Sequence, residues 1–184
     1  NLQRTRNFKP IKLVILIALI LIAPLNANAM GSGDKFSDAQ TGLTYSIYKP
    51  ANTLGLKLSD FKLIPCTPGE EEWIYAKYGT GKKVIEIMET MAGVKCSDPG
   101  LSKVMKPVMI NGVGAKVFVY CDPAYAKLYR LCNINDFGKY GGYLMFTTKQ
   151  TKLLKGAEIQ VQSLGGITYE QILAVAKSLK MVGI

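Results

Sequence analysis

Apolar and polar side chains alternate along several short segments of the chain after residue 42. In residues 113–120, "VGAKVFVY", every second residue is small or apolar and falls on one side of an extended chain. Such alternation, with β-branched and aromatic residues, is typical of strands that bury one face. The segments with this pattern are residues 43–48, 56–64, 73–78, 84–90, 113–120, 143–148 and 157–163. Turn signals at Asn111-Gly112 and Gly165-Gly166 favour an antiparallel arrangement.

The pattern changes to helical spacing near the C-terminus. Thr168 and Gln171 form a capping box. Apolar residues then follow at a helical period, with Gly183 beyond the last of them; they are Ile172, Val175, Ala176, Leu179 and Val182. We therefore predict a helix over residues 169–182 that covers one face of the sheet. The expected fold class is α+β, a curved antiparallel sheet of about six to eight strands with a C-terminal amphipathic helix on one face.

The first 29 residues have the pattern of a secretory signal peptide. Four basic residues precede an apolar run at residues 13–23, and Ala27-Asn28-Ala29 provides a small-x-small cleavage site after Ala29. An uncleaved membrane anchor is the alternative, but the run is short of the roughly 20 apolar residues that a spanning helix needs. We expect a signal peptide (1–29), a flexible leader (30–40) and a single domain (41–184). The mature chain, without a membrane span, would be periplasmic or extracellular.

Four cysteines add a constraint on the exported chain. Cys66, Cys96, Cys121 and Cys132 are an even number, which favours two disulfides in an oxidising compartment. We favour pairing Cys66 with Cys96 and Cys121 with Cys132. An unbroken helix after Asp122-Pro123 would hold the second pair about 15 Å apart, so either the chain turns back within this segment or the pairing differs. Without histidine or a C-x-x-C pair, the sequence favours no metal site.

The basic residues are scattered along the chain and indicate a solvated surface, which would suit an anionic envelope or lipid face as a partner. Removing residues 1–29 takes away four of 23 basic residues and none of the 13 acidic ones, which leaves 19 against 13 and a net charge of +6. Only Arg130 among these 19 is an arginine, so nucleic acid is disfavoured, because base-edge and phosphate recognition prefer the arginine fork. The remaining candidates are a lipid, a peptide or an envelope protein.

No segment carries a catalytic motif. "YGTGKK" resembles the end of a phosphate-binding loop, but the motif would need a glycine where Ala76 stands and a hydroxyl residue where Lys83 stands. We interpret residues 79–83 as a hairpin turn. Without histidine, Ser-His-Asp and Cys-His sites are excluded. Glu86 and Glu89 fall on opposite strand faces, and the acidic group at residues 70–72 reads as an exposed turn.

The order of the elements resembles a family. "NGVGAKVFVY", "GYLMFTT" and "AEIQVQSLGGITYEQILAVAKSL" resemble the C-terminal half of extracytoplasmic domains of unknown function that are attached to bacterial anti-sigma-factor-like and secreted proteins. The resemblance covers about residues 41–182 and includes an A-x-S-L close at residues 176–179. It implies a fold similar to that of periplasmic lipoprotein carriers, with helices against the concave side of a curved sheet. The four cysteines and residues 121–136 depart from it, and it implies no catalytic residue.

These observations leave three classes of function. The favoured one is a secreted or periplasmic, non-catalytic binding or sensing module that uses its sheet face or a cleft. The second is a basic structural or interaction protein of the envelope, and the third is a histidine-free secreted enzyme, which the sequence disfavours. We expect no cofactor and no catalytic residue. An apolar cleft would favour the binding module, whereas two facing carboxylates in a deep pocket would favour an enzyme.

Overall fold

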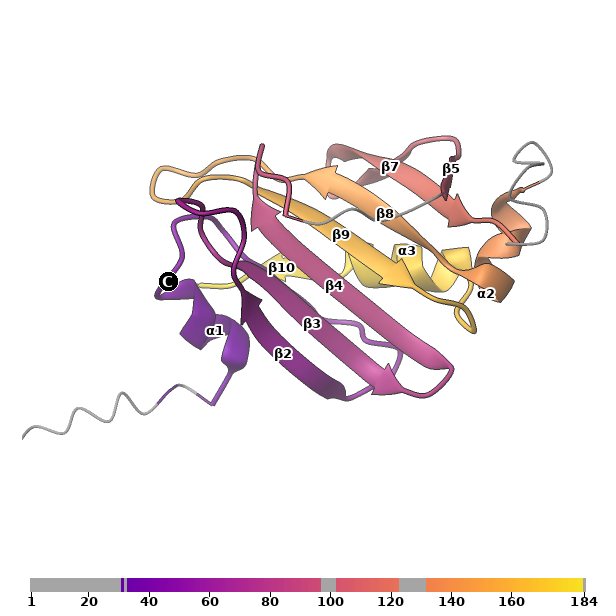
Figure 1. Cartoon of the computed structure of the whole chain (residues 1–184), viewed down its shortest axis with the longest axis horizontal. Coiled ribbons are helices and arrows are strands. Elements are labelled where there is room, and N and C mark those ends of the chain that lie inside the picture. Colours follow the sequence, from indigo (N-terminus) through magenta and orange to yellow (C-terminus); the bar gives the residue numbers. More distant parts are fainter. Residues whose placement is uncertain (1–30, 32, 97–101, 123–131, 184) are drawn as a thin grey trace, which may run out of the picture. The chain divides into compact units, whose positions relative to one another are not determined.

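The computed structural model describes residues 31, 33–96, 102–122 and 132–183. An eight-stranded antiparallel sheet dominates this part of the chain, with helices and a two-stranded ribbon beside it (Figure 1). The predicted α+β class, with an antiparallel sheet and a C-terminal helix, is confirmed.

The large sheet is built mostly from the segments that alternate in the sequence. Its order is β2 (Leu58–Ile64), β3 (Trp73–Thr80), β4 (Lys83–Met91), β9 (Ala157–Ser163), β8 (Gly142–Thr147), β7 (Val113–Tyr120) and β5 (Ser102–Val104), and β6 (Val108–Ile110) pairs with β7. Strand β3 shows the alternation clearly. Ile74, Ala76 and Tyr78 are buried, whereas the residues between them are partly exposed on the opposite face. One face of the sheet therefore carries the core.

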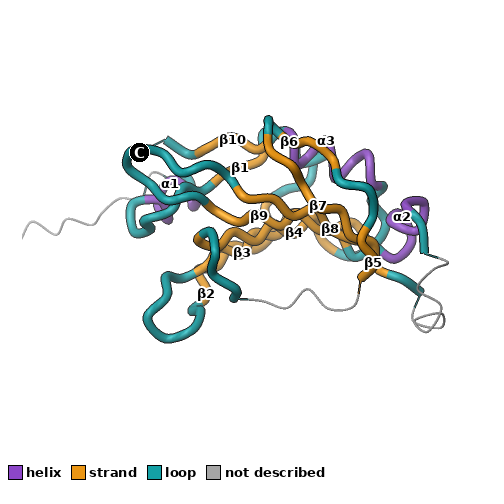
Figure 2. Tube along the Cα trace, turned by 90° about the horizontal axis from the view of Figure 1, so that it is seen from above, coloured by secondary structure: helices purple, strands orange, loops and turns teal. Residues whose placement is uncertain are grey.

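Several elements cover that apolar face. Helices α1 (Lys35–Gln40) and α3 (Tyr169–Lys177) lie on the same side of the sheet as the ribbon of β1 (Tyr48–Pro50) and β10 (Leu179–Met181) (Figure 2). Helix α3 contacts β8 and β9. The 3-10 turn η2 (Ile134–Asp136) and helix α2 (Phe137–Tyr140) pack near β7. The core lies between the sheet and this layer.

The predicted end of the C-terminal helix is wrong. Helix α3 ends at Lys177, and Leu179, expected on the helix, lies in strand β10. The cause is tertiary: Ala51 N–H donates to the Ser178 carbonyl at 3.1 Å, and Asn52 N–H donates to the Ser178 hydroxyl at 2.9 Å. These bonds bring β10 beside β1. Leu179 and Val182 are buried as predicted, but from an extended chain.

The predicted flexible leader is wrong for residues 35–40, which form helix α1. Asp34 caps the helix through the Phe36 N–H at 3.1 Å, and the Phe36 ring is fully buried against Phe61 of β2. Polar composition predicted a leader because a six-residue helix carries little periodic signal. The predicted signal peptide, residues 1–29, lies outside the described residues.

The alternation at residues 43–48 predicts a strand, yet β1 begins only at Tyr48, the last residue of that run. Leu43, Tyr45 and Ile47 are buried as the alternation requires. Their backbone lies in an isolated bridge to Lys155 rather than a full strand ladder, and Gln40 supplies two further bonds: it donates to the Tyr45 carbonyl at 3.0 Å and accepts from Ile47 N–H at 2.9 Å. The pattern thus identified the buried face but not the hydrogen-bonding partners.

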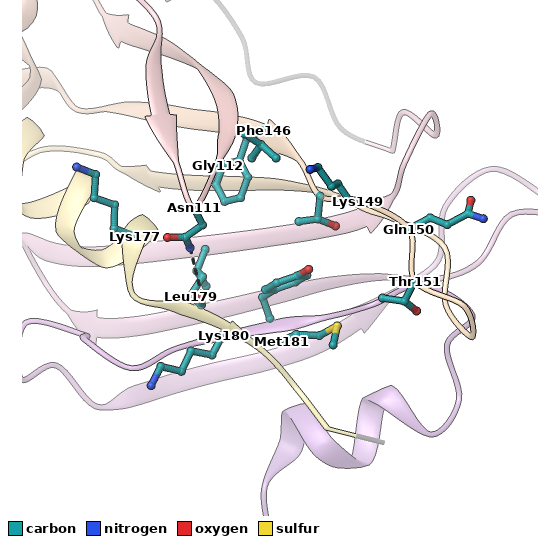
Figure 3. Close-up of a pocket in the computed structure, with 13 residues that line it drawn as sticks. Asn111, Gly112, Phe146, Lys149, Gln150, Thr151, Lys177, Leu179, Lys180 and Met181 are labelled. Carbon is teal, nitrogen blue, oxygen red and sulfur yellow. Dashed lines mark hydrogen bonds between the residues drawn. The ribbon is translucent and has the colours of Figure 1, made fainter.

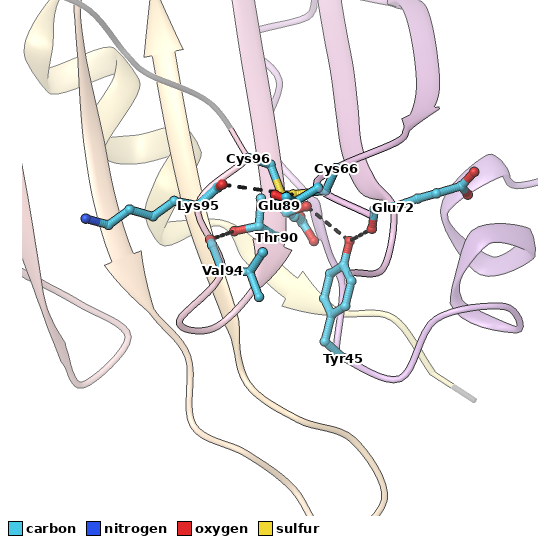
Figure 4. The surroundings of a disulfide bond; sticks show 9 residues. Tyr45, Cys66, Glu72, Glu89, Thr90, Val94, Lys95 and Cys96 are labelled. Carbon is cyan, nitrogen blue, oxygen red and sulfur yellow. Dashed lines mark hydrogen bonds between the residues drawn. A yellow bond between two sulfur atoms is a disulfide. The ribbon is translucent and has the colours of Figure 1, made fainter. Parts of the chain in front are cut away.

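The structure pairs Cys66 with Cys96 and Cys121 with Cys132, as the sequence favours. The Cα atoms are 5.2 Å and 5.6 Å apart, respectively. The first bridge lies beside the buried Glu89 and Tyr45 (Figure 4). The question of a helix or a turn after Asp122 falls on residues 123–131, outside the described residues. The two disulfides indicate a non-reducing compartment. Within the described residues, no helix is long and apolar enough to cross a membrane.

Candidate functional site

A cleft of about 640 Å³ opens between the β1–β10 ribbon and one end of the large sheet (Figure 3). Its walls come from β1, the β6–β7 hairpin, the end of β8 with the following loop, and the end of α3 with β10. The lining residues are Tyr48, Asn111, Gly112, Val113, Phe146, Thr148, Lys149, Gln150, Thr151, Lys177, Leu179, Lys180 and Met181. Four segments that are distant in sequence therefore meet at one opening.

The lining combines apolar, basic and uncharged polar side chains, the last being Asn111, Thr148, Gln150 and Thr151. Phe146 and Leu179 are almost fully buried and supply aromatic and aliphatic surface, and Val113 is half-buried beside them. Lys149 and Lys180 are exposed and stand on different walls (Figure 3). Lys177 adds a third ammonium group, and none of the lining residues is acidic. The cleft combines an apolar interior with a positive mouth.

The ribbon and a hairpin tip form the cleft because their sequences fix the backbone. In the ribbon, Tyr48 is opposite Met181, and Pro50 is opposite Leu179. Asn111 and Gly112 have φ values of 49° and 81°, the left-handed conformation that Asn and Gly adopt most readily in a tight turn. The Asn111 amide then donates to the Leu179 carbonyl at 3.4 Å, so the hairpin tip is joined to β10.

The lysines at the mouth are available to a ligand. Lys149, Lys177 and Lys180 form no ion pair with any described residue. With no carboxylate among the lining residues, their charges reinforce one another in a cleft that is partly shielded from water, which strengthens the attraction of an anion. Because the lining holds neither two carboxylates nor a Cys, it offers no acid–base pair of the kind used by glycosidases and no activated thiol.

A buried carboxyl group lies behind the ribbon. Glu89 of β4 is fully buried, and Tyr48 N–H donates to its two oxygens at 2.9 and 3.2 Å. The Tyr45 hydroxyl donates to the Glu89 carbonyl at 3.1 Å and to the Glu72 carbonyl at 2.9 Å (Figure 4). Burial raises the pKa of the Glu89 carboxyl well above its usual range, and the bond from Tyr48 offsets only part of this rise. Glu89 holds the strand that carries Tyr48 into the cleft.

A second, smaller cleft of about 320 Å³ lies at the opposite end of the sheet. Lys77, Lys82 and Lys139 line it together with Glu86. The Glu86 carboxylate already accepts a hydrogen bond from the Tyr75 hydroxyl at 2.6 Å and another from the Gln162 amide. The Glu86 carboxylate is therefore already hydrogen-bonded within the protein, and this cleft offers limited apolar surface. The larger cleft is the better candidate.

The structure separates the acidic residues considered in the sequence. Glu86 and Glu89 lie on opposite faces of β4, as predicted. The predicted hairpin between β3 and β4 is present, with its turn confined to Gly81 and Lys82. Glu70 and Glu72 are exposed, as expected, and the half-buried Glu71 accepts from the Thr44 N–H at 2.9 Å and from its hydroxyl at 2.6 Å. Within the described residues, no three acidic or Cys side chains form a cluster that could hold a metal ion.

Sequence reasoning missed the cleft itself. Lys149, Lys177 and Lys180 could not be grouped from the sequence, because it does not show that the β8–β9 loop and β10 meet. The available signal was local: residues 148–155 contain three lysines and two leucines without an acidic residue. No protein-family model, curated protein or solved structure matches this chain. The resemblance to extracytoplasmic domains therefore stays a prediction.

Proposed function

We propose that this protein is an exported, non-catalytic binding module, periplasmic or extracellular, whose cleft holds an anionic amphiphile such as a fatty acid or a lysophospholipid. The observation that supports this most is the composition of the cleft, an apolar interior with three lysines and no acidic residue at its mouth. A ligand with an apolar chain and a negative head group matches both parts. The disulfides are consistent with the exported location.

The size and chemistry of the cleft support this ligand class. A volume of about 640 Å³ lies within the range of about 300–1,000 Å³ that is usual for small-molecule pockets. Lysine ammonium groups act as point charges with flexible stems, which suits a carboxylate or phosphate without a fixed bidentate geometry. The amide of Asn111 and the hydroxyl of Thr148 provide polar groups close to the apolar surface. Binding would therefore need no catalytic group.

The second candidate function is a basic protein of the envelope that acts through its charged surface alone. The net charge of +6 that remains without residues 1–29 favours it. It predicts electrostatic binding without chain-length preference and without a role for the cleft interior. A ligand that requires the apolar interior separates the two candidates.

A fluorescence titration tests the proposal. The probe is dansylundecanoic acid, and its methyl ester serves as the uncharged comparison. We expect saturable binding of the acid with an emission blue shift, and weaker binding of the ester. Val113→Phe should occlude the interior and reduce affinity at least tenfold. Val104→Phe, the same change at an exposed position of β5 outside the cleft, should leave affinity unchanged.

A variant that removes two lysines of the cleft gives a second test, because Val113→Phe could also lose binding through misfolding. Lys177→Gln/Lys180→Gln changes two exposed side chains and should weaken binding of the acid by about two- to fivefold per lysine, as exposed ion pairs do. Binding of the ester should be unaffected. Equal binding of the acid to the wild-type protein, this double variant and Val113→Phe would rule out the cleft as the site.

A further inference from the structure

The loop between β8 and β9 presents a leucine to solvent in a strongly basic context. Leu153 is 79% exposed. Lys149, Lys152 and Lys155 are exposed in the same loop, and residues 148–156 contain no acidic side chain. An exposed apolar side chain is common on protein surfaces when it stands alone, so the significance of Leu153 depends on what holds it there and what surrounds it.

Hydrogen bonds hold this loop in one conformation. Thr151 N–H donates to the Leu154 carbonyl at 2.8 Å, and the Thr151 hydroxyl oxygen accepts from Leu153 N–H at 3.2 Å and Leu154 N–H at 2.9 Å. The base of the loop is closed because Thr148 N–H donates to the Ala157 carbonyl at 2.8 Å. The turn therefore fixes Leu153 at the tip, directed away from the core.

The loop stands beside a second exposed apolar side chain. Met181 of β10 is 48% exposed and lines the same cleft as Lys149, Gln150 and Thr151 of the loop. Lys177 and Lys180 are exposed on the facing wall. We define the docking face as Lys149, Lys152, Leu153, Lys177, Lys180 and Met181. Lys149, Lys177, Lys180 and Met181 line the cleft itself, and Lys152 and Leu153 follow its lining residue Thr151 in the loop. None of the four lysines pairs with an acid among the described residues.

We propose that the docking face binds the surface of an anionic phospholipid membrane, with Leu153 and Met181 inserted among the head groups and the four lysines against lipid phosphates. The charge of the docking face favours an anionic membrane as the partner. Lysine ammonium groups on flexible stems need no fixed hydrogen-bond geometry, so they suit a plane of phosphate groups. Leu153 and Met181 are two separated apolar groups, which is too little for the apolar centre of a protein interface of about 800 Å² per partner. Apolar side chains that enter a membrane interface add to the electrostatic attraction between a basic surface and anionic lipids.

This inference rests on the proposed function, because docking brings the mouth of the same cleft to the head-group layer. An anionic amphiphile could then pass between membrane and cleft without exposing its apolar chain to water. If the protein docks in this way, its ligand comes from the membrane lipids rather than from a free metabolite. The docking itself can be measured without any ligand in the cleft.

Vesicle co-sedimentation tests the proposal with the protein purified in its exported form. Vesicles of phosphatidylcholine alone are compared with vesicles containing phosphatidylglycerol. We expect binding to the anionic vesicles, weakened by salt. Because each lysine near an anionic surface contributes about fivefold in affinity, Lys149→Gln/Lys152→Gln should reduce binding about 25-fold. Leu153→Asp should abolish most of it.

Matched controls lie at the opposite end of the sheet, where Ile85 is paired with Ser163. Lys82→Gln/Lys83→Gln removes the same charge from two exposed lysines of the β3–β4 hairpin. Leu164→Asp changes another exposed leucine, which is 63% exposed. Both should bind anionic vesicles within about threefold of the wild-type protein. Equal losses in the control and docking-face variants would overturn the proposal in favour of net charge alone.

The probe titration keeps this proposal distinguishable from the proposed function. If Leu153→Asp loses vesicle binding but binds dansylundecanoic acid like the wild-type protein, both are supported. If vesicle binding depends on the docking face but the probe does not bind, docking stands and the cleft function fails. If the probe binds and Leu153→Asp sediments with anionic vesicles like the wild-type protein, docking is overturned and the cleft function stands.

Discussion

At the scale of single residues, Glu89 is the least expected feature of the core. It is fully buried under the ribbon, and no Lys or Arg among the described residues forms an ion pair with it. Burial raises the pKa of its carboxyl, so the folded state binds a proton more tightly than the unfolded state. The resulting stabilisation is complete below the unfolded pKa, about 4.3, and is lost as the pH rises toward the folded pKa.

Replacement of Glu89 should reveal this linkage. Between the two pKa values, the free energy of unfolding of the wild-type protein should fall relative to that of Glu89→Gln, by up to about 1.4 kcal/mol per pH unit. Urea denaturation at a series of pH values from 4 upward measures it. Glu158→Gln, on the opposite face of the sheet, is the control and should follow the wild-type curve. Parallel curves for the wild-type protein and Glu89→Gln would contradict a raised pKa.

Two glycines of the sheet differ in how much space surrounds them. A Cβ at Gly142 of β8 would lie 2.3 Å from the Phe118 carbonyl oxygen and 2.6 Å from the Phe137 ring. A Cβ at Gly114 of β7 would have no neighbour within 4 Å. Gly142→Ala should therefore destabilise by about 1–3 kcal/mol through overpacking, whereas Gly114→Ala should change stability by less than about 0.5 kcal/mol. Thermal denaturation compares them, and equal melting temperatures would refute the close approach.

At the scale of elements, the C-terminal segment changes from helix to strand at Ser178. The backbone N–H groups of Ala51 and Asn52 donate hydrogen bonds to Ser178, and the chain then continues as β10, which pairs with β1. This change places Leu179 in the interior of the cleft and leaves Lys180 and Met181 at its mouth. A helix continued to residue 182 would not present these three side chains on one strand. The cleft therefore depends on this transition.

Leu179→Ala tests the role of that strand in stability. The side chain is almost fully buried, so its truncation should lower the free energy of unfolding by about 2–5 kcal/mol. Leu153→Ala, the same change at the exposed loop tip, should cost less than about 0.5 kcal/mol. Urea denaturation of both variants gives the comparison. Equal stability of Leu179→Ala and the wild-type protein would show that β10 does not pack as described.

At the scale of the whole molecule, two disulfides hold the ends of the described elements together. Cys66 follows β2 and Cys96 follows β4, whereas Cys121 follows β7 and Cys132 precedes η2. Each bridge is expected to stabilise the fold by about 2–4 kcal/mol. Together they constrain two connections that leave the sheet.

Thiol titration of the denatured, unreduced protein checks the oxidation state. We expect no reactive thiol, because all four cysteines are bridged. Two or more titratable thiols in the exported protein would contradict the pairing. Reduction should lower the melting temperature measurably, since it releases both constraints.

The sequence predicted the long strands well and the short elements poorly. The predicted residues 113–120 and 157–163 coincide with β7 and β9, because seven or eight alternating residues carry a clear period. The three-residue strands β1, β5, β6 and β10 have too few positions to show one. Their pairing depends on partners distant in sequence, such as Tyr48 opposite Met181. The cleft could not be predicted for the same reason, because its lysines and apolar residues come together only when the ribbon has formed.

The central claim is that the cleft holds an anionic amphiphile, and native mass spectrometry of the protein purified from its own envelope tests it most directly. We predict a bound species whose mass and fragments identify a lipid with an acidic head group. That species should be absent from Val113→Phe and present in Val104→Phe. Unliganded protein throughout, or a bound species that Val113→Phe retains in full, would contradict the claim.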